Sequence, residues 1–183
     1  MKLILASASP RRKELLRYIT EDFTVRISDA DETTPNGLTP EETVRYLSRL
    51  KADAVYNGDP DETIVASDTI VVIDGRVLGK PHGEEETKTM LRTLSGRTHT
   101  VFTGVCVKTA ERERVFAERT EVTFYPLTEE EICAYVATGE PMDKAGSYGI
   151  QGKGSLLVQK IDGDFYNVMG LPVAALWRAL KEI

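Results

Sequence analysis

Strand-like and helix-like segments alternate along the whole chain, and this alternation constrains the fold more than any other feature. Apolar, β-branched runs such as Thr63–Ser67 and Ile70–Ile73 have the composition of buried strands. Other segments, such as Glu84–Leu94, place apolar residues at helical spacing. A chain of this kind covers a sheet with helices, so we predict a layered α/β fold. The 183 residues contain no repeats or low-complexity linkers, so we expect one domain spanning 1–183.

Local signals mark where several helices begin. Ser9 and Pro10 are typical of an N-cap and the first helical position. Capping boxes, in which a threonine precedes a glutamate by three residues, occur at Thr39–Glu42 and Thr128–Glu131. Each of these three sites predicts a helix start. The last expected helix, near the C-terminus, should bury Trp177.

Turn signals separate the expected strands. Asp74–Gly75 is typical of a tight hairpin turn. Asp162–Asp164 precedes the apolar run Phe165–Met169, which predicts a second hairpin with a strand over that run. Alternation of apolar and polar residues over Phe23–Ile27 predicts another strand.

The charge balance limits the partners. The chain has 23 Lys+Arg and 29 Asp+Glu, a formal net charge of −6. Nucleic acid polymers and anionic membranes attract a basic face, so we expect neither as a partner. A small polyanion held by a few local cations is compatible with this composition.

The cysteines and the apolar runs indicate a cytoplasmic protein. Cys106 and Cys133 are too few for a disulfide framework, and we expect both to be small core residues in a reducing compartment. The run Leu3–Ala6 is shorter than the roughly 7–15 apolar residues of a signal-peptide core. No run approaches the roughly 18 apolar residues that span a bilayer.

The segment Ser7–Arg12 (SASPRR) joins the first expected strand to the first helix. A helix N-terminus presents unpaired N–H groups and a partial positive charge, which suit a phosphate. Arg11 and Arg12 oppose the helix dipole there by roughly a few tenths of a kcal/mol each, unless an anion binds. The alternative is a solvated helix start whose arginines pair with surface carboxylates. A Walker A loop is excluded, because Gly-x-x-x-x-Gly-Lys is absent.

Carboxylates gather at two places in the pattern of expected strands. Asp29, Asp31 and Glu32 follow one strand, and Asp68 separates two apolar runs. Mg²⁺ prefers a few carboxylates with water and substrate phosphates, whereas Asp is also common in ordinary turns. Turn chemistry explains Asp68 less well, because a buried charge is costly unless it is paired or bound to a metal. A metal site and an ion pair with an arginine are the two interpretations for Asp68.

Two lysines and a glutamine occupy unusual positions. Lys80 lies between Gly79 and Pro81, and Lys51 lies at the edge of an apolar helix face. Each lysine could meet a phosphate or extend along the surface into water. Gln151 is flanked by a glycine-rich stretch, and its amide could pair with the N3–H and carbonyl of uracil or thymine. Its other possible role is to stabilise its own loop.

Two common kinds of catalytic site find no support in the sequence. His82 and His99 are the only histidines, and both lie in polar sequence surroundings, so we expect no Ser-His-Asp or Cys-His site. No CxxC or HExxH pattern suggests zinc.

A series of ordered motifs resembles those of the Maf family. Together they extend over essentially the whole chain, and each alone would be weak. In chain order they are Leu5–Leu16, Glu32, Lys51, Ser67–Thr69, Gly79–Pro81, Leu94–His99, Asp143–Gly152 and Val168–Pro172.

The resemblance implies a nucleoside triphosphate pyrophosphatase, which hydrolyses the α–β anhydride to a monophosphate and pyrophosphate with a divalent cation, Mg²⁺ or Mn²⁺. It implies a mixed twisted sheet flanked by helices, related to the inosine triphosphatases, with two lobes and a central nucleotide cleft. It also implies a homodimer. In the branch acting on dTTP and UTP, three specificity positions are Arg, Thr and Gln, which fall here on Arg11, Thr69 and Gln151. The chain therefore resembles this branch, whose house-cleaning activity could extend to CTP or modified pyrimidine nucleotides.

The resemblance and the chemistry together suggest roles for the remaining motif residues. Asp68 is the candidate general base, and Glu32 with Asp68 would hold the cation. Four further residues would bind the substrate: Ser7, Arg12, Lys51 and Lys80.

Two alternative functions stay open at this point. One is the same chemistry on a modified purine such as 7-methyl-GTP. The other is a non-catalytic nucleotide-binding regulator of septum formation. The presence of Glu32, Asp68 and Lys80 favours catalysis over binding alone, because pure binding does not require a positioned base.

Overall fold

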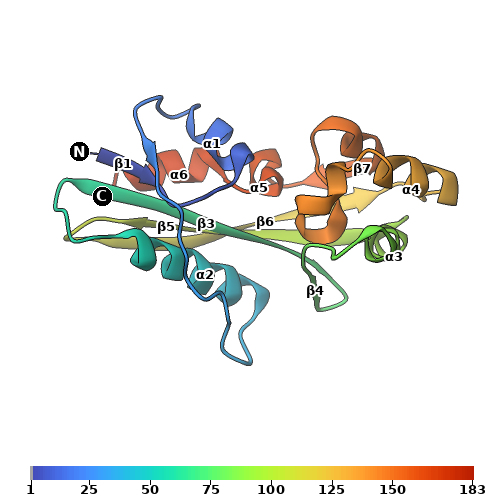
Figure 1. Cartoon of the computed structure of the whole chain (residues 1–183), viewed down its shortest axis with the longest axis horizontal. Helices are drawn as coiled ribbons and strands as arrows, with labels where there is room; N and C mark the ends of the chain where they lie inside the picture. The colour runs from blue at the N-terminus through green and yellow to red at the C-terminus, as the bar shows by residue number, and fades with distance from the viewer. Residues whose placement is uncertain (1) are drawn as a thin grey trace. The chain divides into compact units, whose positions relative to one another are not determined.

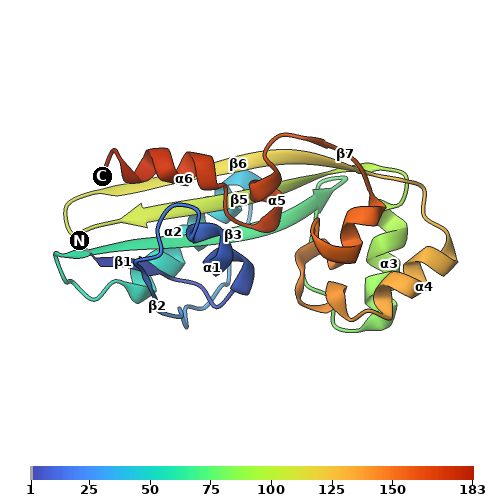
Figure 2. The same cartoon turned by 90° about the horizontal axis from the view of Figure 1, so that it is seen from above.

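A computed structural model describes residues 2–183 (Figures 1 and 2). The chain forms two compact units. The first comprises 2–69, 103–118 and 170–183, and the second comprises 70–102 and 119–169. The expectation of one domain spanning 1–183 stays a prediction.

A sheet of seven strands runs in the order β2-β1-β3-β5-β6-β7, with β4 paired to β3. β1 is parallel to β2 and β3, whereas the β3–β4 and β6–β7 pairs are antiparallel, so the sheet is mixed as expected. The strands β3, β5 and β6 contribute residues to both units. The bounds are β1 Lys2–Leu5, β2 Thr24–Val25, β3 Glu62–Ile73, β4 Arg76–Leu78, β5 Thr98–Lys108, β6 Glu113–Phe124 and β7 Val158–Asp162.

The first unit has helices on both faces of its strands. These helices are α1 (Pro10–Leu16), α2 (Pro40–Val55) and α6 (Val173–Leu180). Figures 1 and 2 show α2 on one face of β1 and β3, with α1 and α6 on the other. The core on the α2 face consists of Ile4, Ala6, Ala52, Val55, Ile64, Ala66 and Cys106.

Side-chain alternation along β3 decides which helix each site residue can reach. Ile64 and Ala66 point toward α2, where they pack with Ala52 and Val55. Successive strand residues point to opposite faces of a sheet, so Asp68 also faces α2. Its neighbours Ser67 and Thr69 face the side of α1.

The second unit contains the helices α3 (Glu84–Leu94), α4 (Glu129–Val136) and α5 (Phe165–Met169). Three 3₁₀ helices follow α4, namely η1 (Glu140–Asp143), η2 (Ala145–Ser147) and η3 (Gly152–Leu157). Its core includes the fully buried side chains of Phe124, Leu91 and Leu94. Within residues 2–183, no helix is both long and apolar enough to cross a membrane.

Most helix starts and turns are confirmed. The hydroxyl of Ser9 accepts a hydrogen bond from the Arg12 N–H at the start of α1. Both capping boxes are formed, at Thr39–Glu42 and at Thr128–Glu131. Asp74 and Gly75 both have positive φ, as a type I′ hairpin turn requires.

Four expectations are wrong in part or in full. The strand expected over 23–27 is only Thr24–Val25, and 165–169 is helical rather than extended. The Trp177 side chain is 45% exposed, where Lys181 Nζ lies 3.2 Å from the ring centroid. Cys106 is buried, but Cys133 is exposed; both are free thiols. Burial raises the pKa of Cys106 to about 12, so this thiol is unreactive.

Gly104, on β5, lies directly against the backbone of α2. A Cβ at this position would lie 2.1 Å from the Val44 carbonyl oxygen and 2.8 Å from the Arg45 nitrogen. Such distances are far below van der Waals contact, so glycine is what allows α2 to pack this closely on the sheet. This packing brings Lys51, farther along α2, to the strand that carries Asp68.

His99 lies in the core of the second unit with 2% of its surface exposed. Its ring contacts the edges of the Phe124 and Tyr148 rings, and a 2.7 Å hydrogen bond joins His99 Nε2 to the Tyr148 hydroxyl. Burial lowers the pKa of His99 to about 4 and raises the pKa of Tyr148. Both side chains are therefore neutral at neutral pH.

Gly104→Ala is expected to lower the free energy of unfolding by about 1–3 kcal/mol, because α2 must move away from β5. Urea unfolding curves measure this change. Gly79→Ala is the matched control, since a Cβ there meets nothing within 4 Å. If the two variants have equal unfolding midpoints, the proposed constraint at Gly104 is absent.

The buried His99 should make stability depend on pH. Its pKa is lowered from 6.5 to about 4 in the folded chain, so stability is complete above pH 6.5 and falls as the pH drops toward 4. The shift corresponds to a loss on the order of 3 kcal/mol. Urea midpoints of His99→Gln should fall less steeply over this range than wild type, whereas the exposed-site variant His82→Gln should keep the wild-type slope. Parallel curves for all three proteins would contradict the role of His99.

Candidate functional site

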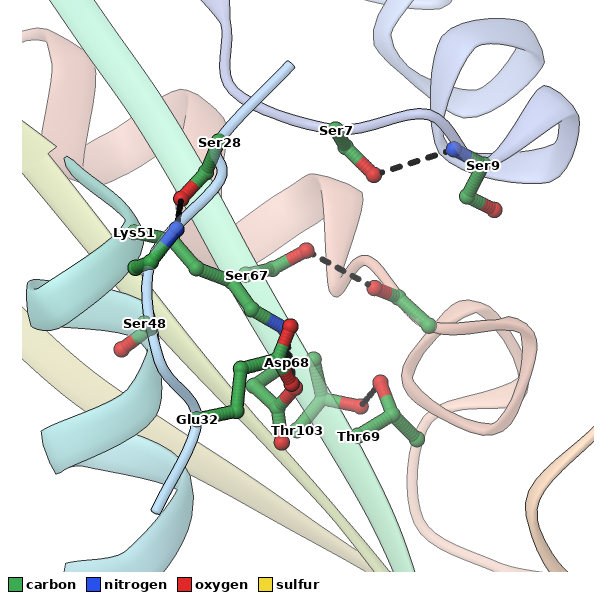
Figure 3. Close-up of polar contacts among 12 residues, drawn as sticks. Ser7, Ser9, Ser28, Glu32, Ser48, Lys51, Ser67, Asp68, Thr69 and Thr103 are labelled. Carbon is green, nitrogen blue, oxygen red and sulfur yellow. Dashed lines mark hydrogen bonds and ion pairs between the residues drawn. The ribbon is translucent and has the colours of Figure 1, made fainter. Parts of the chain in front are cut away.

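An ion-pair cluster links α2, β3 and the loop after β2. Lys51 Nζ donates to Asp68 Oδ1 at 2.6 Å and pairs with Glu32 Oε2 at 3.1 Å. The Lys51 and Asp68 side chains are 12% and 11% exposed, whereas Glu32 is 55% exposed. Figure 3 shows Lys51 and Glu32 pointing toward Asp68 from separate segments. The fold therefore brings three candidate residues, Glu32, Lys51 and Asp68, together in the first unit.

The position of Asp68 explains why an apolar strand carries a charge. The β3 side chains on either side of it, from Glu62 to Ile73, are almost all buried. A buried carboxylate is stable when a cation and hydrogen bonds compensate its lost hydration. The cation that pairs with Asp68 is Lys51. The sequence had suggested an arginine as the partner in such an ion pair.

β3 has an interrupted edge next to this cluster. Its parallel partner β1 ends where Leu5 pairs with Val65, and the antiparallel β4 begins to pair only at Val71. Asp68 lies between these two ladders. Residues 66–70 of β3, which include Asp68, therefore pair with neither β1 nor β4.

Arg12 is the centre of a second polar cluster, on the α1 side. Its guanidinium donates from Nε to the Gly170 carbonyl at 2.9 Å, from Nη2 to Thr69 Oγ1 at 3.1 Å and from Nη1 to Ser7 Oγ at 3.5 Å. Burial lowers the pKa of Arg12, and the Asp68 and Glu32 carboxylates oppose that effect. An arginine stays charged under such a shift, so Arg12 presents a fixed cation.

Hydroxyl groups complete the Arg12 cluster. Ser67 Oγ donates to the same Gly170 carbonyl at 3.2 Å, and the Thr69 and Thr103 hydroxyls lie 2.9 Å apart. Figure 3 shows the labelled hydroxyls of Ser67, Thr69 and Thr103 along this part of the sheet. Arg12 is held on several sides, which fixes the direction of its guanidinium.

Arg11 adds a second positive charge at the start of α1. Its charge lowers the pKa of Arg12, so the two guanidinium groups are close enough to repel each other. Ser7 Oγ accepts from the Ser9 backbone N–H at 3.2 Å and holds the turn that leads into the helix. An anion bound here would relieve the repulsion between the two arginines.

Lys80 and Gln151 lie in the second unit, and both are exposed. Their segments are joined by a backbone hydrogen bond, in which the Gly146 N–H donates to the Gly79 carbonyl at 3.0 Å. Gln151 immediately precedes η3 and has extended backbone angles. This hydrogen bond connects the turn with Lys80 to the segment that leads into the loop with Gln151.

The other candidate carboxylates behave differently from Glu32. Asp31 accepts hydrogen bonds from the N–H and hydroxyl of Thr33, and these bonds hold its pKa low. That is ordinary turn chemistry. Among residues 2–183, no group of three or more His, Cys, Asp or Glu side chains could hold a metal ion. The carboxylates of Glu32 and Asp68, which share Lys51, are the pair that could contribute to a cation site.

Sequence reasoning missed Gly170 and Thr103 as members of the site. Gly170 has a φ of +109°, and a Cβ there would lie 3.4 Å from both Arg12 Nε and Thr69 Oγ1. The sequence indicated Gly170 only through its position in the motif Val168–Pro172. Thr103 carried no signal, because a threonine within a strand is ordinary.

The family of the chain follows from its similarity to known proteins. A family model described as Maf-like protein (Maf) matches residues 2–183. A dTTP/UTP pyrophosphatase of Bacillus velezensis is 55% identical over 181 residues, which cover 99% of this chain and 96% of the relative. A dTTP/UTP pyrophosphatase of Bacillus cereus is 53% identical, covering 99% of this chain and 95% of the relative.

A solved structure supports the fold. A HAM1 protein from Coxiella burnetii superposes with a TM-score of 0.52 at 15% identity, and the alignment covers 100% of both chains. At that identity the likeness concerns the fold alone, and it agrees with the expected mixed sheet flanked by helices. The match over residues 2–183 and the identity to relatives lead to one conclusion: the chain belongs to the Maf family.

Proposed function

We propose that this protein is a nucleoside triphosphate pyrophosphatase that hydrolyses dTTP and UTP to the monophosphate and pyrophosphate. The names of relatives 55% and 53% identical to the chain support the substrate class. The observation that carries the chemistry is the convergence of Asp68, Lys51 and Glu32 next to the fixed cation of Arg12. Such a cluster supplies a candidate base and positive charge, two of the features that recur in enzymes of phosphoryl transfer.

Asp68 is the proposed general base. Lys51 donates to Oδ1 at 2.6 Å and fixes the orientation of the carboxylate, so we assign proton acceptance to Oδ2. The proton would come from the water that attacks the α phosphorus in line with the departing pyrophosphate. Because the Asp68 side chain is 11% exposed, little competing solvent surrounds it.

A divalent cation, Mg²⁺ or Mn²⁺, fits the pair of carboxylates. Glu32 and Asp68 both reach Lys51 Nζ, at 3.1 and 2.6 Å, so their oxygens already converge on one positive charge. Carboxylate oxygens, completed by water and substrate phosphate, are the ligands that Mg²⁺ prefers. When bound, the cation would neutralise charge on the triphosphate and polarise the scissile anhydride.

The remaining candidates divide between the triphosphate and the base. Ser7, Arg12, Lys51 and Lys80 would bind phosphate oxygens and stabilise the departing pyrophosphate. Arg11 and Gln151 would read the carbonyl and N3–H edge of the pyrimidine. Thr69, which accepts from Arg12, would shape the pocket for the base. We further propose that the protein works as a homodimer in the cytoplasm.

A substrate panel tests the function directly. We expect dTTP and UTP to be hydrolysed with release of pyrophosphate in Mg²⁺ or Mn²⁺, and activity to stop when EDTA removes the cation. Pyrophosphate detection with dTTP, UTP, CTP, GTP and 7-methyl-GTP ranks the bases. A preference for 7-methyl-GTP would replace the pyrimidine assignment, and tight binding without turnover of any nucleotide would replace the enzymatic one.

Asp68→Asn should lower kcat for UTP by about 10²- to 10⁴-fold, the usual contribution of a general base. Thermal melting checks that the fold is kept. Asp53→Asn is the matched control, because Asp53 lies on α2 and pairs with Lys108 at the surface. Turnover of Asp68→Asn within a few-fold of the control would contradict the assignment of the base.

A further inference from the structure

The loop that carries Gln151 is built around the side chain of Glu140. We propose that Glu140 is a positioning residue for base recognition, which acts through the backbone on either side of Gln151. The proposal rests on the role of Gln151 in the proposed function. Glu140 lies at the start of η1, within the second unit, and it is half-buried.

The Glu140 carboxylate accepts hydrogen bonds from the chain that follows Gln151. Oε2 accepts from the Lys153 N–H at 3.0 Å, and Oε1 accepts from the Gly154 N–H at 3.1 Å. These are the N–H groups at the start of η3. A charged acceptor makes such bonds roughly twice as strong as a neutral one.

The same carboxylate also reaches the chain that precedes Gln151. The Tyr135 hydroxyl donates to Glu140 Oε1 at 3.0 Å, and the Gly149 N–H donates to that hydroxyl at 3.1 Å. Glu140 therefore holds the loop on both sides of Gln151, directly on one side and through Tyr135 on the other.

The glycines of the loop lie very close to the side chains of Glu140 and Tyr135. Gly152 has a φ of +63°, and a Cβ there would lie 2.7 Å from Glu140 Oε2. At Gly154, a Cβ would lie 2.7 Å from the Tyr135 hydroxyl and 2.0 Å from the Gly149 carbonyl oxygen. Because side chains are excluded at these positions, the loop can approach the carboxylate closely enough for backbone hydrogen bonds.

Glu140 is itself held in place. Its N–H donates to Thr138 Oγ1 at 3.1 Å, and Lys144 Nζ donates to its backbone carbonyl. Lys144 Nζ also pairs with Asp143 Oδ1 at 2.7 Å. The carboxylate thus projects from a fixed turn, as a residue that positions a neighbouring loop requires.

A glutamine at position 140 separates shape from hydrogen bonding. It has nearly the same size as glutamate, but one of its two terminal groups is an NH₂ donor. The loop presents N–H donors to both Glu140 oxygens, so one donor would face another donor in the variant. The loop would lose part of its order while the turn and the core stayed intact.

Steady-state kinetics of Glu140→Gln with UTP test the proposal. We expect KM to rise about 10-fold and kcat to change less than about 3-fold, because binding of the base is lost rather than the chemistry. The inhibition constant of inorganic tripolyphosphate, which has no base, should stay at the wild-type value. Glu129→Gln is the matched control, since Glu129 is exposed and pairs with Arg92. Equal weakening of UTP and tripolyphosphate would overturn the proposal.

A double-mutant cycle shows whether Glu140 acts through Gln151. Gln151→Ala should raise the KM for UTP, and adding Glu140→Gln to it should raise KM little further. Fully additive effects would overturn the proposal. If wild-type protein fails to hydrolyse UTP, the proposed function fails by itself, before either variant is compared.

A second variant keeps the proposal testable if Glu140→Gln does not fold. If Glu140→Gln melts below the assay temperature, Tyr135→Phe removes only the hydroxyl that joins Glu140 to the Gly149 N–H. We expect it to raise the KM for UTP in the same direction by a smaller factor, again without change in tripolyphosphate inhibition. An unchanged KM for UTP in this variant would overturn the proposal.

Discussion

The compensation of one buried carboxylate organises the first unit. Asp68 lies in a strand whose other side chains are almost all buried, and its partner Lys51 comes from a helix on that face of the sheet. The pair requires α2 to lie close to the strands, and Gly104 makes this approach possible. An unpaired charge would destabilise an apolar strand. Here the charge of Asp68 is paired with Lys51, which also connects α2 and β3 to the loop with Glu32.

The two faces of β3 carry different groups of the candidate site. The alternation of side chains sends Asp68 toward α2 and sends Ser67 and Thr69 toward Arg12 and Gly170. One face thereby gathers carboxylates and Lys51, and the other fixes a guanidinium among hydroxyls and a carbonyl. Both sets contact the stretch of β3 between Val65 and Val71, which pairs with neither β1 nor β4.

The sequence best predicts the local features that depend on interactions between residues close together in the chain. The capping boxes at Thr39 and Thr128 and the Asp74–Gly75 turn depend on residues within one turn of each other, and all three are formed. The strand predicted over 165–169 is a helix, because short apolar runs do not distinguish strand from helix. There the buried Asn167 donates to the Val101 carbonyl and to Thr120 Oγ1, contacts that no local pattern reveals.

The candidate site was predictable as a set of residues but not as contacts. Motif order identified Arg12, Lys51 and Asp68, whereas the choice of Lys51 over an arginine as the partner of Asp68 depends on the packing of α2. Local chemistry alone does not separate Glu32 from Asp31, although only Glu32 is a motif position of the family resemblance. The fold distinguishes them, because Asp31 closes a turn with Thr33 and Glu32 reaches Lys51.

The bond from Arg12 to the Gly170 carbonyl joins residues 158 positions apart. During synthesis this carbonyl is made 158 residues after the guanidinium, so the hydrogen bond cannot form until both segments have left the ribosome. Ser67 and Thr69, which also contact Gly170 or Arg12, lie between the two segments in the sequence. A translation product that stops before residue 170 would lack the carbonyl that orients Arg12.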